Sequence, residues 1–135
     1  TVAGKRIAVL GFAFKADTGD TRESPAIRVV RGLLEERADV VVSDPKAIAN
    51  AQNDLRDVAD RVTFEEDPYK ACEGAHAVAI LTEWKQYREL DFARILAGMK
   101  HPAFLFDGRN ILDHRRLFDL GFNVTAIGKA PLRHF

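Results

Sequence analysis

The sequence predicts an α/β fold of the Rossmann-like type, in which a mostly parallel sheet carries helices on both faces in three layers. Short apolar runs recur along the 135 residues, and stretches with helical spacing separate them. The helical stretches begin at Ser or Asp, which favour helix starts, and two of these residues precede proline. Right-handed crossovers would then place the strands side by side in one sheet. The length is that of one domain, so we expect a single domain over residues 1–135.

The first part of the chain predicts a strand, a helix and a second strand. The apolar run at residues 6–14 is typical of a strand that is buried on both faces. Ser24 can cap a helix and Pro25 suits its first turn. A left-handed cap at the end of this helix would fall near Arg37, a residue that tolerates it poorly. Residues 40–44 predict the second strand, because the residue before a proline is disfavoured in a helix.

The rest of the chain continues the alternation of strands and helices. Residues 46–61 are polar with scattered apolar positions, and they predict a loop with a short surface helix. Asp67 and Asp91 are expected to cap helices, and Gly74 and Gly121 to end two of them. The expected strands comprise residues 62–64, 75–81, 103–106 and 124–127, and the expected helices begin near residues 67, 91 and 113.

The composition excludes several classes of protein. Twenty basic residues balance twenty acidic ones, so neither nucleic acid nor an anionic membrane is an expected partner. The longest apolar stretch is far shorter than the roughly 20 residues of a membrane-spanning helix. Cys72 is the only cysteine, which fits a cytoplasmic protein, and we expect a small buried hydrophobic side chain there rather than a nucleophile. The four histidines lack metal-ligand spacing, and no metal site is expected.

A charged loop at residues 11–24 follows the first expected strand. It has neither the G-x-G-x-x-G pattern of dinucleotide binding nor a P-loop, so ordinary NAD binding by this domain is not expected. Lys15, Arg22 and the start of the helix at Ser24 would suit a phosphate group. Surface ion pairing is an equally good interpretation of the two cations. Their partners would be acidic residues of the same loop, which are Asp17, Asp20 and Glu23.

A second loop at the same edge of the sheet contains Arg109. Ligands of open parallel sheets bind beyond the carboxyl ends of the strands, where this loop and the first one both lie. The guanidinium of Arg109 could bind a phosphate or a carboxylate with two parallel hydrogen bonds. The alternative is an Asp107-Gly108 turn with a pendant surface arginine.

Two further residues near this edge have both a structural and a functional interpretation. Asp44 ends the second strand, where a true dinucleotide-binding domain has the acid that holds the ribose. Without the glycine pattern, we interpret Asp44 as a remnant of that acid or as a turn residue. Trp84 follows a buried strand and lines the ligand crevice or, in our preferred interpretation, packs over the end of the sheet.

The same segments resemble the C-terminal, UDP-binding domain of the UDP-glucose/GDP-mannose dehydrogenase family. The resemblance covers nearly the whole chain and rests on several motifs in the order of the family. They are Gly4-Lys5, the loop from Gly11 to Ala26, Asp44-Pro45, Asp67-Pro68-Tyr69, Thr82-Glu83-Trp84 and Phe106-Asp107-Gly108-Arg109. Arg37 departs from the pattern, because relatives usually have glycine there.

The resemblance implies a function for the two charged loops. Phe14, Lys15 and Arg109 correspond to residues that bind the UDP-sugar, and Arg22 corresponds to a residue that reaches NAD on another domain. The loop is most similar to the branch of the family that oxidises UDP-glucose to UDP-glucuronate with two NAD. In that family NAD is held by an N-terminal domain, the catalytic cysteine lies in the larger part of the enzyme outside this domain, and the enzyme forms a homo-oligomer. The resemblance therefore places no catalytic residue in these 135 residues, and we expect the chain alone to be inactive.

Two other functions remain compatible with the sequence. The chain could be a freestanding UDP-sugar-binding or regulatory module without catalysis. It could also be an interaction domain with a decayed site, in which case replacing Lys15 or Arg109 by alanine would change nothing.

Overall fold

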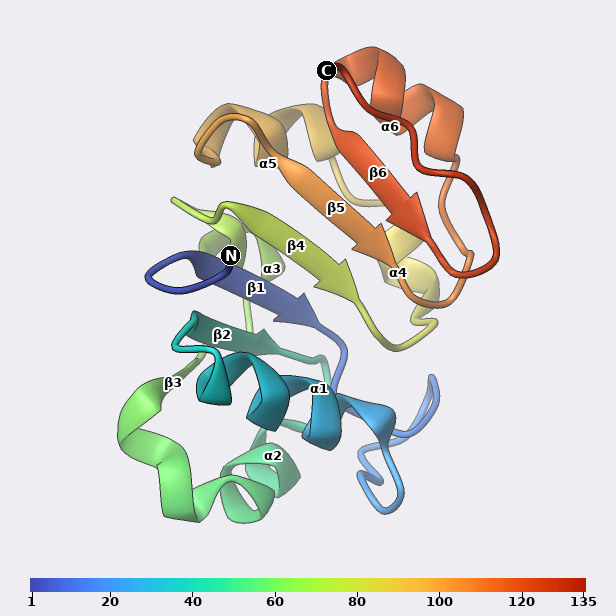
Figure 1. The fold of residues 1–135 in the computed structure, drawn as a ribbon. Helices are drawn as coiled ribbons and strands as arrows, with labels where there is room; N and C mark the ends of the chain where they lie inside the picture. Colours follow the sequence, from blue (N-terminus) through green and yellow to red (C-terminus); the bar gives the residue numbers. More distant parts are fainter.

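The computed structural model describes residues 1–135 and contains one six-stranded sheet whose strands pair in the order β3-β2-β1-β4-β5-β6 (Figure 1). Every pair of neighbouring strands is parallel. The sequence order therefore reverses at β1 and β4, the point where open α/β sheets bind ligands. The strands are β1 (Arg6–Leu10), β2 (Asp39–Ser43), β3 (Val62–Phe64), β4 (Ala77–Ile80), β5 (Phe104–Asp107) and β6 (Asn123–Ala126).

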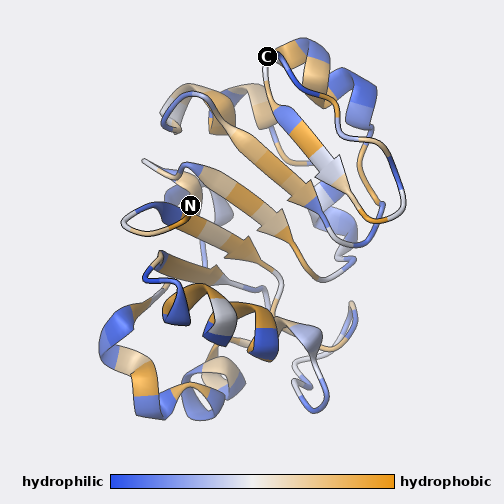
Figure 2. Ribbon diagram, viewed as in Figure 1, coloured by the Kyte–Doolittle hydropathy of each residue, from blue (hydrophilic) through white to orange (hydrophobic).

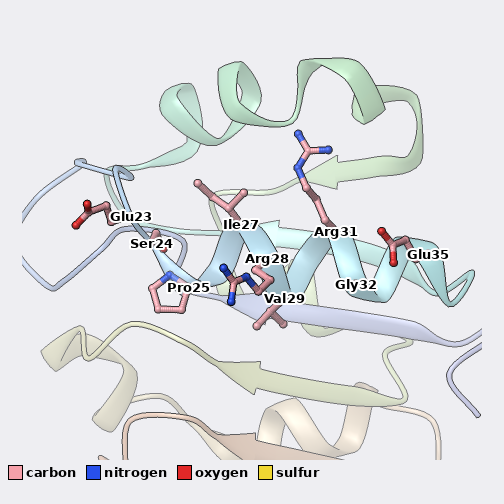
Figure 3. A pocket seen from close by; sticks show the side chains of 9 residues that line it. All are labelled: Glu23, Ser24, Pro25, Ile27, Arg28, Val29, Arg31, Gly32 and Glu35. Atoms are coloured by element: carbon pink, nitrogen blue, oxygen red, sulfur yellow. The ribbon is translucent and has the colours of Figure 1, made fainter.

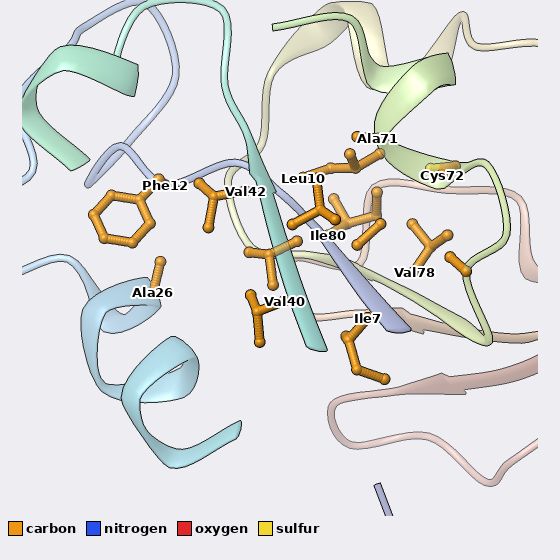
Figure 4. Close-up of a cluster of buried hydrophobic side chains, with 14 of the residues drawn as sticks. Ile7, Leu10, Phe12, Ala26, Val40, Val42, Ala71, Cys72, Val78 and Ile80 are labelled. Atoms are coloured by element: carbon orange, nitrogen blue, oxygen red, sulfur yellow. The ribbon is translucent and has the colours of Figure 1, made fainter. Parts of the chain in front are cut away.

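Helices cover both faces of this sheet and complete the three predicted layers. Successive residues of a strand point to opposite faces. Val40 of β2 faces the side on which Ala26 of α1 packs, whereas Leu10 of β1 faces Ala71 and Cys72 of α3 (Figure 4). The hydrophobic residues concentrate along the central strands, and polar residues are frequent on the helices (Figure 2). The helices are α1 (Pro25–Glu35), α2 (Ile48–Asp54), the 3-10 helix η1 (Arg56–Arg61), α3 (Pro68–Cys72), α4 (Lys85–Arg88), α5 (Phe92–Gly98) and α6 (His114–Leu120).

The predicted start of α1 is confirmed, and the structure settles its end, which the sequence left open. The Ser24 hydroxyl accepts a hydrogen bond from the Ala26 N–H and donates one to the Phe12 carbonyl oxygen at 2.7 Å, so the cap also ties α1 to the loop after β1. The chain leaves the helix through Arg37, whose φ is +65°. This left-handed conformation costs a non-glycine residue about 1 kcal/mol. Arg37 adopts it because the Ala38 N–H then bonds to the Leu33 carbonyl oxygen at 3.0 Å and the chain turns into β2.

The fold differs from the predicted elements at three places. The first strand was expected over residues 6–14 but ends at Leu10, where Gly11 follows with a φ of +96°. Residues 46–61 contain two short helical segments, α2 and η1, where the sequence predicted one helix and a loop. Ala51 and Leu55 are buried there, which gives this polar stretch an inner face. The helix α4 is also absent from the prediction, because its four residues are too few to show a periodic pattern.

The single cysteine has the buried environment that was expected. Cys72 ends α3 and is almost completely shielded from solvent. Loss of solvation raises the pKa of its thiol to about 12. The thiolate that a nucleophile needs is therefore disfavoured.

None of the helices combines the length and the apolar character that crossing a membrane would require.

Candidate functional site

Arg109 joins three loops at the carboxyl edge of the sheet. It lies after β5, and its Nε donates a hydrogen bond to the Leu81 carbonyl oxygen after β4 at 3.0 Å. Its Nη2 donates to the Phe14 carbonyl oxygen after β1 at 2.9 Å. The sequence left open a pendant surface arginine, and the structure instead has a side chain that is 30% exposed and held by main-chain acceptors.

Glu83 completes this arrangement and was not identified as a site residue from the sequence. Its Oε2 lies 3.0 Å from Nη1 of Arg109, and its Oε1 accepts a hydrogen bond from the Ala16 N–H at 2.6 Å. One carboxylate thereby connects the arginine to the loop that carries Lys15. The neighbouring Trp84 suggested an aromatic near the edge, but no sequence pattern indicates that Glu83 bridges two distant loops. We refer to Arg109, Glu83 and their main-chain partners as the Arg109 network.

A glycine allows the Arg109 loop to approach the sheet. A Cβ atom on Gly108 would lie 2.9 Å from the Ile80 carbonyl oxygen and 3.1 Å from the ring of Phe106. The Gly108 N–H donates to that same carbonyl at 2.9 Å. The buried Asp107 accepts hydrogen bonds from the Arg109 N–H and from Nε2 of His114, which fixes the two ends of the loop.

Phe14 and Lys15 lie beside this network on the loop after β1. The side chain of Phe14 is exposed although its carbonyl oxygen is bound by Arg109. Lys15 is also exposed, and it forms no ion pair with any acid of its loop. The surface pairing that the sequence allowed for Lys15 is therefore absent, and its ammonium group is free to meet an anion.

Arg22 has the other of the two settings that the sequence left open. Its guanidinium forms two parallel hydrogen bonds with Asp20 of the same loop, at 3.0 and 2.8 Å. The side chain of Arg22 is 88% exposed and does not enter the Arg109 network. The hydrogen bond from Arg22 lowers the pKa of Asp20 to about 2.

Asp44 closes the position where a dinucleotide-binding domain would hold a ribose. The side chain is only 1% exposed. One oxygen accepts from the Lys46 and Ala47 N–H groups, as in a turn, which confirms one of its two interpretations. The other oxygen accepts from the main chain at Phe12 and Ala13, at 2.8 and 3.0 Å. Both oxygens are thus occupied by protein donors.

Trp84 also packs over the end of the sheet, as preferred from the sequence. Its ring is 3% exposed, and Nε1 donates to Asp44 at 3.2 Å. The contacts of Asp44 and Trp84 together hold the loop after β1 against the end of the sheet. They leave no free carboxylate for a ribose diol, in agreement with the missing glycine pattern.

The largest cavity lies elsewhere, along the outer face of α1. It measures about 930 Å³ (Figure 3). Only two of its nine lining residues are hydrophobic, whereas ligand pockets are lined predominantly by hydrophobic and aromatic side chains. We therefore locate the candidate site at the Arg109 network. The residues that line the α1 groove are Glu23, Ser24, Pro25, Ile27, Arg28, Val29, Arg31, Gly32 and Glu35.

The fold and this edge define a class of protein. The sheet has the strand order of nucleotide-binding α/β domains. In its first loop, however, Asp44 binds the N–H groups of Phe12 and Ala13 and is not available to a dinucleotide. Residues 8–114 match the UDP binding domain of the UDP-glucose/GDP-mannose dehydrogenase family. The chain belongs to this family.

Individual relatives agree with this assignment. The chain is 49% identical to a UDP-glucose 6-dehydrogenase of Caenorhabditis elegans over 97% of its own length and 29% of the relative. It is 48% identical to UDP-glucose 6-dehydrogenase 1 of Oryza sativa subsp. japonica, over 96% of the chain and 31% of the relative. The solved UDP-glucose dehydrogenase of Pyrobaculum islandicum superposes with a TM-score of 0.71 at 33% identity, over 90% of this chain and 26% of that one. The chain thus spans about a third of the length of the curated relatives it matches.

Proposed function

We propose that this chain is the UDP-sugar-binding part of an NAD-dependent UDP-glucose 6-dehydrogenase, which converts UDP-glucose to UDP-glucuronate. The observation that carries the proposal is a free lysine beside a fixed arginine at the reversal point of the sheet. Lys15 and Arg109 together would balance the negative charge of a diphosphate. The exposed ring of Phe14 offers an apolar surface to the rest of the ligand.

The geometry favours an anion at this edge. Arg109 has five N–H donors, of which Nε and one on Nη2 bind main-chain oxygens. Glu83 lies 3.0 Å from Nη1, so one N–H on Nη1 and one on Nη2 remain for a phosphate oxygen. The anchoring contacts hold the guanidinium in place before the ligand arrives, so less side-chain entropy is lost on binding.

NAD does not fit this chain as a resident cofactor. The loop after β1 lacks the glycines that let a pyrophosphate approach, and Asp44 has no free oxygen for a ribose. NAD would supply the hydride acceptor of the reaction while bound on another part of the enzyme. Arg22 is the residue that we propose contacts it there, since its exposed side chain is paired only within its own loop.

We also propose a cellular location, a metabolic use and an oligomeric state for the enzyme. The single, buried cysteine suits a reducing compartment, which supports a cytoplasmic location. The relatives' names support the oxidation of UDP-glucose, and we propose polysaccharide biosynthesis as the use of its product. We propose a homo-oligomer as the working form, because the family resemblance implies one.

Calorimetric titration of the chain with UDP, UDP-glucose and NAD tests the proposed function. We expect both uridine nucleotides to bind and NAD not to bind. Lys15→Ala should weaken UDP by about tenfold or more, because a charge-assisted hydrogen bond is lost. Lys100→Ala is the matched control, since Lys100 is an exposed lysine that precedes β5 at the opposite edge of the sheet. Equal affinities of the two variants, or binding of NAD alone, would contradict the proposal.

A further inference from the structure

Glu83 has a role that its charge alone does not suggest. A carboxylate beside an anion site would be expected to repel a phosphate. Glu83 nevertheless lies in the Arg109 network, with Oε2 at 3.0 Å from Nη1 of the arginine. Its other oxygen is bound to the Ala16 N–H, one residue beyond Lys15. Its side chain is only 33% exposed.

We propose that Glu83 is the positioning residue of the UDP-sugar site, and that it holds Arg109 and the Lys15 loop in their binding arrangement. This inference rests on the proposed function of that site. Glu83 touches both cationic segments at once, and its carboxylate adds a second link beside the one from Arg109 to the Phe14 carbonyl oxygen. The residue therefore acts on the ligand through Arg109 and through the main chain beside Lys15.

The loop after β1 needs such an anchor. Asp17, two residues beyond Lys15, has a φ of +66°, in the left-handed region that is uncommon for residues other than glycine. Asp44 holds the loop at Phe12 and Ala13 and Arg109 holds it at Phe14, but the segment after Lys15 lies beyond those contacts. The hydrogen bond from the Ala16 N–H to Glu83 spans 67 residues of sequence and ties that segment to the loop after β4.

The positioning effect should exceed the repulsion. Glu83 accepts a hydrogen bond from the Ala16 N–H, and its charge is offset by the guanidinium at 3.0 Å. The network is partly exposed, so water screens the remaining repulsion of a phosphate. An arginine with one anchor removed can instead sample other rotamers, and this lowers its contribution to binding.

Three variants test the role of Glu83, with UDP as the probe in calorimetric titrations. Glu83→Gln should weaken UDP by about tenfold, the size that is typical when a supporting partner of a binding residue is removed. Glu83→Asp keeps the charge but is one methylene shorter, so it should also lose affinity because it cannot span both partners. Glu89→Gln is the control, because it makes the same chemical change at an exposed residue six positions along the chain.

A double-mutant cycle separates positioning from a general structural effect. Glu83→Gln should weaken UDP by a smaller factor in an Arg109→Ala background than in the original chain, since part of its effect passes through the arginine. The NMR signal of the Arg109 Nε–H should exchange slowly with solvent in the original chain and rapidly in Glu83→Gln. This second measurement does not depend on the ligand.

The outcomes distinguish this inference from the proposed function. Unchanged or tighter UDP binding by Glu83→Gln would overturn the positioning role and leave the proposed function intact. Fully additive losses in the cycle would also overturn it. Absence of UDP binding by the original chain would overturn the proposed function and the role of Glu83 with it.

Discussion

Arg109 and Arg22 were both candidate ligand-binding residues in the sequence, yet the structure gives them opposite settings. Arg109 contacts the carbonyl oxygens of Leu81 and Phe14, which lie 28 and 95 positions away in the sequence. Arg22 contacts Asp20, two positions away. The first side chain is 30% exposed and the second is 88% exposed.

The difference lies in what each arginine fixes. A long-range contact joins loops from separate strands and determines the shape of the edge of the sheet. A pair within one exposed loop restricts only that loop, and such pairs have little effect on stability. If this distinction holds, variants at long-range contacts should change stability and UDP binding, and variants at Arg22 should change neither in the isolated chain.

Asp44→Ala is the variant with the largest expected effect. It leaves buried N–H donors of Phe12, Ala13 and Trp84 without an acceptor. Unpaired buried donors cost about 1 to 3 kcal/mol each, so the free energy of unfolding should fall by about 3 kcal/mol or more. Urea denaturation measures this change. Asp44→Asn keeps one side-chain oxygen, so its free energy of unfolding should fall by less. A fall of under about 1 kcal/mol in Asp44→Ala would contradict the role of Asp44 in holding this loop.

Gly108→Ala should have the second-largest effect. The added Cβ would lie 2.9 Å from the Ile80 carbonyl oxygen, so the loop that carries Arg109 must move outward. We expect a loss of about 2 kcal/mol in the free energy of unfolding, and weaker binding of UDP.

Gly32→Ala is the control for this variant. Gly32 lies within α1 and has open space at its Cβ position. Alanine there should stabilise the chain by about 1 kcal/mol, because glycine is unfavourable inside a helix. The two substitutions are chemically identical, so the same sign of effect in both would show that the close approach at Gly108 is unimportant.

The fold was predictable from the sequence where the signal is local. Ser24, Asp67 and Asp91 cap helices as predicted, because a cap depends on neighbours two or three residues away. The buried strands were also predictable, since a parallel sheet covered on both faces needs continuous apolar runs. The helix α4 was missed because one turn is too short for a periodic signal.

The site was only partly predictable, for the opposite reason. The charged loops, with Lys15 and Arg109, could be placed at one edge from the topology alone. Glu83 could not be identified, since its two partners lie in loops 67 and 26 positions away and become neighbours only through the order of the strands. The two settings of Arg109 and Arg22 were indistinguishable in the sequence for the same reason.

Arg109→Lys tests whether the network needs the shape of the guanidinium or only its charge. Lysine retains the charge but cannot reach two carbonyl oxygens and a carboxylate at once. We expect UDP to bind about tenfold more weakly, with a loss of roughly 1 kcal/mol in the free energy of unfolding. Titration with UDP and urea denaturation measure the two effects. Full retention of UDP affinity would show that charge alone suffices.

Arg22→Ala should have the smallest effect, and it tests whether an arginine paired within one exposed loop matters for stability or UDP binding. The urea midpoint and the UDP affinity of the chain should not change measurably, because Arg22 is exposed and Asp20 is partly exposed. The pKa of Asp20 should rise from about 2 toward its ordinary value of 3.8, as an NMR titration of the carboxyl group would show. Since Arg22 lowers this pKa in the folded chain, any stability from the pair is present above pH 3.8 and is lost as the pH falls toward 2. If Arg22→Ala instead weakened UDP as much as Arg109→Lys, both arginines would belong to one site and the distinction between local and long-range contacts would fail.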